Sequence, residues 1–336
     1  MHATFSVKTI GIAYNLRRPE KVDDCDEEYD SPETIDSLSS ELRRLGFDVL
    51  HFEQDEDFIK KLAKHKPDFV LNLAEGIGSG RGRESQVPCI LEAMDIPYSG
   101  SDPVTLGITL DKYLTNNLLR TAGIPVPDIY LIASPGDLPA LRDTFKRETA
   151  YILKPRWEGS SKGIFNDSII SSYDDLCPKA VNIMTRYSQP VVLEKFITGD
   201  EITAGLIGNS SPEVIGMMKI SPADGSSDNF IYSLEKKRTW KETIQYHPEN
   251  SIKEDIKAEI TRAALSAFKV LELRDVARID FRLDGDDAPK IIDINPLPGL
   301  SPSYSDLPIM YGLKGGRYTD LVRSILLTSF ERCGIG

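Results

Sequence analysis

Short apolar strands alternate with amphipathic helices through the first hundred residues of the chain. Apolar runs of strand length are separated by stretches in which apolar residues recur at helical spacing. Ser31 and Pro32 begin the first helix as N-cap and first-turn proline, and Gly46 ends it. The order β-α-β-α-β predicts a parallel sheet flanked by helices, with ligands bound beyond the carboxyl ends of the strands. The predicted elements span residues 8–14, 31–45, 47–52, 55–65 and 68–73.

Beyond residue 84 the pattern predicts helices and strands joined by longer polar connections. Helices are expected at 84–94, 102–122, 135–147, 172–186, 251–271 and 318–330, and strands at 129–133, 151–154, 164–170, 190–196, 201–207 and 217–220. The chain of 336 residues suffices for two or three packed units. We expect an α/β (α+β) protein with an N-terminal unit at 1–104, a central unit at 105–196 and a C-terminal unit at 197–336.

The most informative stretch, residues 275–304, predicts a β-hairpin. Two runs rich in branched and aromatic residues, 276–283 and 290–294, flank the sequence D-G-D-D. A turn centred on Asp286–Asp287 places only apolar side chains on one face, namely Ile279, Phe281, Leu283, Ile292 and Ile294. On the other face, Asp280 then pairs with Asp293 and Arg278 with Asn295.

The pairing of Asp280 with Asp293 predicts a cation site. Directly paired side chains lie about 5 Å apart in a sheet, and like charges so placed are destabilising. Two carboxylates beside the Asn295 amide offer hard oxygen ligands, which suit Mg²⁺ bridging nucleotide phosphates. The alternative is an edge hairpin with an ordinary solvated, charged face.

A glycine/serine loop follows the predicted strand 151–154. Its sequence is P-R-W-E-G-S-S-K-G, with Lys154 before it and Lys162 inside it. Small residues allow close backbone approach to a ligand, and N–H groups between two ammonium groups suit a polyphosphate. A hairpin turn with surface lysines is the structural alternative. Residues 159–163 also match the hydrolase pattern G-x-S-x-G, but a strand rather than a helix is predicted after them, and only His247 follows.

Two further segments fit a nucleotide site. The link at 197–200 joins two predicted strands, where backbone groups can read an adenine edge and a carboxylate can hold ribose hydroxyls. The polar segment 221–245 is long for a compact domain, and its basic cluster at 236–238 indicates a lid over anions or, alternatively, a solvated surface. The glycine run at 76–82 ends a predicted strand, yet it matches neither nucleotide-binding glycine motif.

Composition narrows the class of partner. The formal net charge of −12 argues against nucleic acid and membrane surfaces, and no apolar run approaches the roughly 20 residues of a membrane span. The four cysteines lie far apart without metal-ligand spacing, and the N-terminal residues lack a secretory apolar segment. We expect a cytoplasmic protein that acts on small molecules.

In order and spacing, four sets of motifs resemble the ATP-grasp superfamily, and most closely the D-alanine–D-alanine ligase family. They are R-I-D-F-R-L-D with D-I-N-P-L-P-G, K-P-R-W-E-G-S-S-K-G, L-E-K-F-I-T-G-D-E-I-T, and I-P-Y-S-G-S with L-D-K. The resemblance covers nearly the whole chain and implies an ATP-grasp fold behind an N-terminal parallel-sheet domain. It also implies an ATP-dependent carboxylate–amine ligase that works through an acyl phosphate, and a homodimer formed through the N-terminal unit.

The resemblance assigns roles to individual residues. Two Mg²⁺ ions, or Mn²⁺ in their place, would bind Asp280, Asp293 and Asn295, where Asp293 replaces the family's usual glutamate. The residues that would contact ATP are Lys112, Lys154, Glu158, Ser161, Glu194, Lys195, Phe196, Ile197, Glu201 and Lys237, with Glu201 at the ribose and Lys237 at the γ-phosphate. Catalysis would use Arg278, Ser160, Lys237 and the Gly299 backbone N–H, with Arg278 facing the phosphoryl group.

The substrate end departs from the family pattern. Glu75 and Tyr304 stand where the family has a histidine and a serine, and Arg238 stands where the lid carries a tyrosine. The family's first-loop glutamate has two candidates here. The implied substrate residues are Glu28 or Asp30, Glu75, Arg238, Ser303 and Tyr304.

Three hypotheses within the ligase class and one outside it follow. The leading one is a ligase that joins two amino acids or amino-acid-like molecules. The alternatives are D-alanine–D-alanine ligase proper and a specialised-metabolite ligase of the mycosporine type. A nucleotide-binding regulator without catalysis is the hypothesis of another class, and retention of the metal-binding set favours an enzyme over it.

Overall fold

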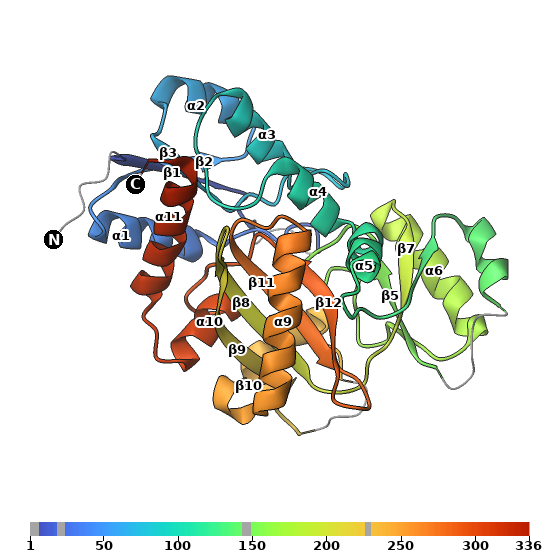
Figure 1. The fold of residues 1–336 in the computed structure, drawn as a ribbon. Helices are drawn as coiled ribbons and strands as arrows, with labels where there is room; N and C mark the ends of the chain where they lie inside the picture. Colours follow the sequence, from blue (N-terminus) through green and yellow to red (C-terminus); the bar gives the residue numbers. More distant parts are fainter. Residues whose placement is uncertain (1–6, 19–23, 143–148, 226–229, 336) are drawn as a thin grey trace.

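The computed structural model describes residues 7–18, 24–142, 149–225 and 230–335, which form three sheets in chain order (Figure 1). The first is a parallel sheet, as the sequence predicts, and its strand order is β2-β1-β3. Its strands are β1 (Thr9–Tyr14), β2 (Asp48–Glu53) and β3 (Phe69–Asn72), and its helices are α1 (Pro32–Arg44), α2 (Phe58–His65) and α3 (Gln86–Ala93). Ser31 caps α1 as expected, because its side chain accepts the Thr34 N–H.

The helical region predicted over 102–122 is confirmed, but the chain breaks at Asp111 and forms two helices. Helix α4 (Pro103–Leu110) ends there in an extended backbone, and α5 (Lys112–Thr121) begins with the Asp111 carboxylate accepting the Leu114 N–H at 3.1 Å. Arg156 also donates its Nε–H to this carboxylate, at 2.8 Å. The break therefore places Lys112 at the start of a new helix beside the loop that follows β5.

The second sheet is antiparallel, with strand order β4-β7-β5-β6. It contains β4 (Ile129–Ile132), β5 (Tyr151–Pro155), β6 (Ile169–Ile170) and β7 (Val191–Lys195), with helix α6 (Tyr173–Tyr187) packed against it. The predicted helix over 135–147 appears only as a 3₁₀ helix, Pro135–Leu141, and residues 143–148 lie outside the described ranges. The predicted strand over 164–170 shrinks to Ile169–Ile170, because residues 161–168 form turns around the glycine/serine loop.

The third sheet is also antiparallel and lies in the middle of the molecule, with strand order β10-β9-β8-β11-β12 (Figure 1). Its strands are β8 (Glu201–Gly208), β9 (Glu213–Pro222), β10 (Ile244–Pro248), β11 (Asp275–Leu283) and β12 (Pro289–Asn295). Helix α9 (Glu254–Val270) covers one face through Ile256, Ile260, Ala264 and Phe268, the predicted stripe. The predicted polar loop instead holds two short helices, α7 (Leu234–Arg238) and α8 (Trp240–Thr243), and part of β10, with a 3₁₀ turn, Glu249–Ser251, after it.

The β11–β12 hairpin has the predicted pairing where the polar side chains lie. Asp280 is opposite Asp293 and Arg278 is opposite Asn295. Nearer the turn, however, Phe281 is opposite Ile291, so Ile292 is an extra residue in a β-bulge. The prediction that Ile292 joins the apolar face is therefore wrong: Ile291 enters the core, and Ile292 lines a cavity on the other side.

The end of the chain returns to the first sheet. Helices α10 (Asp306–Leu313) and α11 (Tyr318–Cys333) follow the hairpin, and Figure 1 shows α11 beside the parallel sheet. Phe330 on α11 packs edge-on against Phe69 at 4.9 Å and Phe47 at 6.0 Å between ring centroids. The division into units at 1–104, 105–196 and 197–336 stays a prediction, and this shared core crosses one of its boundaries.

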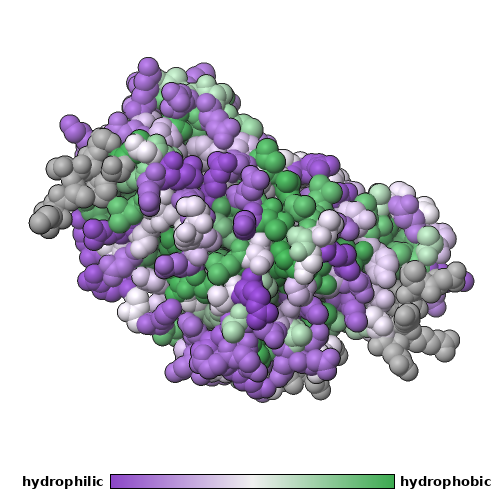
Figure 2. Space-filling model, viewed as in Figure 1, coloured by the Kyte–Doolittle hydropathy of each residue, from purple (hydrophilic) through white to green (hydrophobic). Residues whose placement is uncertain are grey.

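The surface carries few large apolar side chains. Figure 2 shows hydrophobic residues gathered in the middle of one face, near α4 and α9, within a mostly hydrophilic surround. Val104 at the start of α4 is 70% exposed and Ile59 on α2 is 54% exposed. Over the described ranges, no helix is both long and apolar enough to cross a bilayer.

Candidate active site

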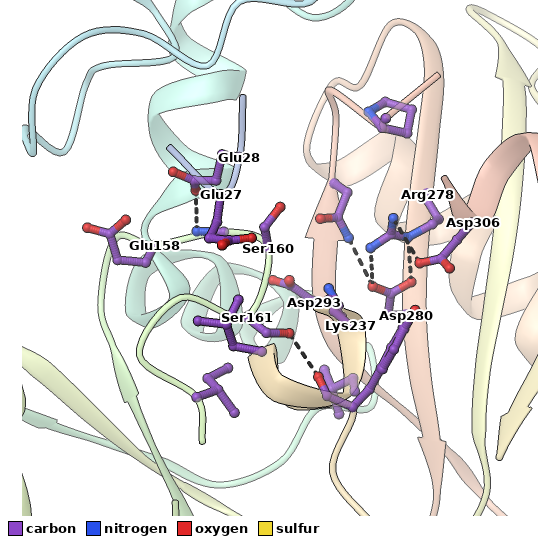
Figure 3. Close-up of a pocket in the computed structure, with 18 of the residues that line it drawn as sticks. Glu27, Glu28, Glu158, Ser160, Ser161, Lys237, Arg278, Asp280, Asp293 and Asp306 are labelled. Atoms are coloured by element: carbon purple, nitrogen blue, oxygen red, sulfur yellow. Dashed lines mark hydrogen bonds and ion pairs between the residues drawn. The ribbon is translucent and has the colours of Figure 1, made fainter. Parts of the chain in front are cut away.

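One cavity of about 620 Å³ is lined by residues of all three sheets and their loops. Its walls come from the first loop of the N-terminal sheet, the loop after β5, the segment after β7, helix α7 and the β11–β12 hairpin (Figure 3). All but two of the residues implied by the sequence line this cavity. Lys195 at the end of β7 and Ser303 in the loop before α10 are exposed instead and lie outside it.

Arg278 and Asp280 form a paired contact on the cavity face of β11. Arg278 Nε donates to Asp280 Oδ1 at 2.9 Å and Nη2 donates to Oδ2 at 2.8 Å, while Nη1 lies 3.3 Å from Asp306 Oδ2 (Figure 3). Burial opposes the Asp280 charge, but Arg278 and a hydrogen bond from Thr203 outweigh it and lower the Asp280 pKa. Burial likewise opposes the Arg278 charge, yet Asp280 and Asp306 raise the pKa of Arg278. The cavity therefore contains a permanently charged guanidinium.

Asp280, Asp293 and Asn295 place oxygen donors together on this face. Asp293 Oδ1 lies 3.4 Å from Lys112 Nζ, and Asn295 Nδ2 donates to Asp280 Oδ2 at 3.1 Å. Within the described chain, the other Asp293 oxygen and the Asn295 amide oxygen accept no hydrogen bond, so both are open to a ligand. Carboxylate and amide oxygens are the donors that Mg²⁺ takes, so these residues fit that ion. No three His, Cys, Asp or Glu side chains form a metal-binding group in the described ranges.

Lys154 and Glu194 form a buried ion pair at the opposite wall. Lys154 Nζ lies 2.7 Å from Glu194 Oε1, because the antiparallel strands β5 and β7 carry both side chains into the cavity. Phe196 and Ile197, just beyond β7, are buried and add an apolar surface. An apolar wall next to a few fixed polar groups is the usual composition of a small-molecule site.

Arg282 holds the segment between the second and third sheets. Its Nη1 lies 3.3 Å from Glu201 Oε2, its Nη2 donates to the Gly199 carbonyl at 3.0 Å, and its guanidinium lies 4.8 Å from the Phe196 ring centroid. Burial raises the pKa of Glu201, although Arg282 partly offsets it. The sequence analysis missed Arg282, although the alternation that placed Arg278 and Asp280 on one face extends to it.

The glycine/serine loop adopts an unusual backbone. Ser160 and Ser161 have φ angles of 47° and 60°, a left-handed conformation that costs non-glycine residues roughly 1 kcal/mol or more each. Ser161 Oγ donates to the Tyr232 carbonyl at 2.9 Å, so the loop is fixed to the segment before α7. No helix follows Ser161, and none of the residues lining the cavity is a histidine. The match to the hydrolase pattern is therefore a coincidence, in agreement with the features against it in the sequence.

Glu28 joins the first loop to the glycine/serine loop. Its Oε1 accepts from Arg83 Nη2 and from the Gly159 N–H, both at 2.6 Å, and its Oε2 lies 3.2 Å from Lys162 Nζ. Burial favours the neutral acid, but Arg83 and Lys162 outweigh it and lower the pKa of Glu28. Every Glu28 oxygen is thus bound within the protein, whereas the Asp30 side chain has no such partner in the described chain.

Helix α7 lines the cavity and contacts the first loop of the N-terminal sheet. Arg238 Nε donates to Glu27 Oε1 at 2.8 Å, and Arg17 Nη2 donates to the same oxygen at 2.9 Å. Lys237 is partly exposed, with its Nζ 4.9 Å from the Tyr232 ring centroid, and desolvation of its ammonium group together with Arg278 lowers its pKa. The basic cluster at 236–238 therefore contributes Lys237 to the cavity and Arg238 to the contact with Glu27.

Three further cavity residues escaped the sequence analysis. Glu84 lies two residues before α3 and is 7% exposed, and its only signal was the arginines beside it in R-G-R-E-S. Asp306 begins α10 inside a segment that looked like a proline-rich loop. Glu27 carried no signal, because its partner Arg238 is 211 residues away.

Comparison with known proteins decides the family. Residues 118–327 match the family model described as D-ala D-ala ligase C-terminus. A D-alanine–D-alanine ligase of Aquifex aeolicus is 30% identical over 298 residues, which cover 89% of this chain and 94% of that protein. The chain belongs to the D-alanine–D-alanine ligase family. It is accordingly an ATP-dependent ligase that joins a carboxylate to an amine.

Solved structures show the same ATP-grasp fold. The Bacillus anthracis D-alanine–D-alanine ligase complexed with ATP superposes with a TM-score of 0.73 at 24% identity, covering 96% of this chain and 98% of that one. The VanG D-Ala:D-Ser ligase of Enterococcus faecalis superposes with a TM-score of 0.71 at 18% identity, covering 96% and 99%. The fold, the enzyme class and the use of ATP expected from the motifs are confirmed.

Proposed function

We propose that this ligase joins two amino acids or amino-acid-like molecules of which at least one is not D-alanine. The observation that carries this proposal is the set of contacts at the substrate end of the cavity. Arg238 reaches Glu27 across the mouth, Glu75 lines the wall, and the Tyr304 hydroxyl lies 3.1 Å from the Thr34 hydroxyl. These three side chains stand where the family pattern has tyrosine, histidine and serine. The substrate groups that they recognise should therefore differ from those of D-alanine.

The nucleotide end supports the reaction class. Lys154 and Lys112 carry ammonium groups into the cavity for the ATP phosphates, and Glu201 lies next to the apolar wall at Phe196 for the ribose and base. The Arg278 guanidinium, fixed between Asp280 and Asp306, would neutralise charge on the transferring phosphoryl group. Positioning and charge neutralisation supply most of the catalysis of phosphoryl transfer, so this set of residues fits activation of a carboxylate.

Asp280, Asp293 and Asn295 would hold Mg²⁺, or Mn²⁺ in its place. A bound divalent ion would supply charge neutralisation at the phosphate oxygens. The protein's own part is to orient these donors: Arg278 fixes Asp280, and Lys112 lies beside Asp293. Closure of α7 would exclude water from the activated carboxylate, since Lys237 and Tyr232 cover the site.

Phosphate release from ATP tests the proposal. The full chain with ATP and Mg²⁺ is assayed against pairs of D- and L-amino acids, and the ligated product is identified by mass spectrometry. We expect at least one pair, in which one or both amino acids differ from D-alanine, to give a kcat/KM at least tenfold above that of D-alanine as both substrates. Stimulation by D-alanine alone would instead assign the chain to D-alanine–D-alanine ligase proper.

A homodimer through the N-terminal unit and a cytoplasmic location are also proposed. The dimer is supported by three exposed apolar residues of that unit, Ile59, Ile77 and Val104, the last of which is 70% exposed. Sedimentation of wild type and Val104→Ser gives the mass directly, and a monomeric wild type would contradict the dimer. Fractionation of cells that express the tagged chain tests the location.

A further inference from the structure

Three carboxylates line the N-terminal end of the cavity without a partner. Asp30 lies just before α1, Glu75 lies three residues after β3, and Glu84 lies two residues before α3. In the described part of the chain, none of the three side chains makes a hydrogen bond or ion pair, and Glu84 is 7% exposed. A buried carboxylate without a counter-charge is costly, so such a group either stays protonated or binds a cation.

The neighbouring cations of the protein are already engaged. Arg83 donates to Glu28 at 2.6 Å, and Lys162 lies 2.6 Å from Glu158 and 3.2 Å from Glu28. Lys112 lies 3.4 Å from Asp293. Each of these side chains faces an acid of its own, which leaves the three unpartnered carboxylates to a charge that comes from outside.

A second, smaller cavity of about 40 Å³ continues the site behind these acids. Glu28, Asp30 and Glu75 line both cavities, and the smaller one is closed by residues 296–300. The Asn72 side-chain nitrogen also belongs to this wall, is buried, and has no hydrogen-bond partner among the described residues. The room behind the acids accommodates a substrate group that extends beyond a methyl side chain.

The electrostatics agree with the geometry. Burial raises the pKa of Asp30 to about 7, and burial raises the pKa of Glu84 to about 8, although Arg83 and Lys112 partly offset it. The pKa of Glu75 is also raised, by burial and by the charges of Glu84 and Glu28. Groups that resist ionisation for want of a counter-ion bind a cation favourably when one arrives.

We propose that one of the two amino-acid substrates carries a second cationic group, an ammonium or guanidinium, bound among Asp30, Glu75 and Glu84. A substrate with a single α-ammonium neutralises one of the three carboxylates, and both Glu28 oxygens are already taken. A diamino or guanidino acid neutralises two. This inference rests on the proposed ligase function and names the substrate class for the same site.

Isosteric pairs of amino acids test the proposal on the full chain with ATP and Mg²⁺. The pairs are 2,3-diaminopropionate with 2-aminobutyrate, 2,4-diaminobutyrate with norvaline, and ornithine with norleucine, each as D and L forms. Within each pair the two molecules differ mainly in charge. We expect kcat/KM for at least one cationic member to exceed that of its neutral isostere tenfold or more. Equal values within every pair would overturn the inference and leave the ligase proposal standing.

Variants locate the charge recognition. Glu75→Gln and Asp30→Asn should each reduce the ratio of cationic to neutral kcat/KM at least fivefold, whereas Asp36→Asn, an exposed acid on α1 outside the cavity, should keep it. ATP binding followed by intrinsic fluorescence shows that each variant is folded. A ratio unchanged in both cavity variants would assign the preference elsewhere and contradict the proposed site.

Binding separates this inference from the ligase function. Calorimetric titration of each pair into protein loaded with a non-hydrolysable ATP analogue measures charge preference without turnover. A tenfold binding preference for the cationic member, with no phosphate release from ATP in the separate turnover assay, would support the site and sink the ligase proposal. Phosphate release with a neutral pair of amino acids, without any preference for the cationic member in binding, would support the ligase proposal and contradict the cationic site.

Discussion

Gly159 donates its backbone N–H to the Glu28 carboxylate at 2.6 Å, although 131 residues separate them in the chain. The contact joins the glycine/serine loop of the second sheet to the first loop of the parallel sheet, and Arg83 and Lys162 complete it. Loops from two parts of the fold thus form one wall of the cavity. The position of either loop depends on the other.

Gly159→Ala should separate these loops. A Cβ at this position would lie 2.6 Å from Glu28 Oε1, closer than real Cβ atoms approach any neighbour. We expect KM for the amino-acid substrates to rise tenfold or more, because Glu28 and its buried cations must shift. Gly285→Ala is the matched control, since its Cβ would meet nothing within 4 Å. Equal KM values for both variants would contradict the role of this contact.

Arg238→Gln should weaken closure of the lid. The variant removes the charge that holds α7 to Glu27 across the cavity mouth but keeps most of the side-chain length. Because Arg238 is partly exposed, we expect a modest effect, in which the variant's KM for the amino-acid substrates is three- to tenfold above that of wild type. Added salt should reduce this difference, because it screens the ion pair in wild type. Lys241→Gln on α8, exposed and outside the cavity, is the control, and a similar rise there would argue for a general charge effect.

Asp293→Ala and Asn295→Ala should each abolish turnover while the protein stays folded. Both remove an oxygen donor from the cavity face of the hairpin, where the unused Asp293 and Asn295 oxygens fit Mg²⁺. Chelation by EDTA should likewise stop phosphate release, and added Mg²⁺ or Mn²⁺ should restore it. Asp286→Ala removes an exposed carboxylate at the hairpin turn and should retain activity. Near-normal rates in the two cavity variants would exclude the metal assignment.

Asp30→Asn should change how stability depends on pH. Burial raises the Asp30 pKa from 3.8 to about 7, so folding favours the protonated acid. The resulting stability is complete below pH 4 and is lost as the pH rises through about 7. The asparagine variant should therefore match wild type near pH 4 and be more stable near pH 8, by about 2–4 kcal/mol. Melting temperatures at the two pH values measure this, and a variant that loses stability at pH 8 would refute it.

Local alternation and turn residues made the hairpin predictable. The period of two fixed which side chains share a face, and the D-G-D-D turn fixed the pairing of Asp280 with Asp293. The bulge at Ile292 could not be predicted, because a run of branched residues reads equally well with or without one unpaired position. The break at Asp111 was also hidden, since the apolar spacing continues across it and the Arg156 contact comes from elsewhere in the chain.

Long-range polar contacts were the main omission at the site. The phosphate-side lysines and hairpin acids were predicted because each lies in a motif with its own spacing. By contrast, the contacts of Glu27 with Arg238 and of Glu28 with Arg83 join residues whose nearness depends on how the sheets pack. Within the ranges that the structure describes, the same packing left the Asp30 side chain, rather than that of Glu28, without a partner, which no local pattern could have indicated.

The extra residue at Ile292 lets the two ends of one hairpin vary independently. On the turn side the strands keep the alternation that seals the core beneath α9, while on the other side they keep the alternation that presents Asp280 and Asp293 to the cavity. Changes in turn length or strand register near Asp286 can be absorbed at this joint before they reach the acids. Relatives of this chain could thus diversify the outer end of the hairpin while the reacting end stays fixed.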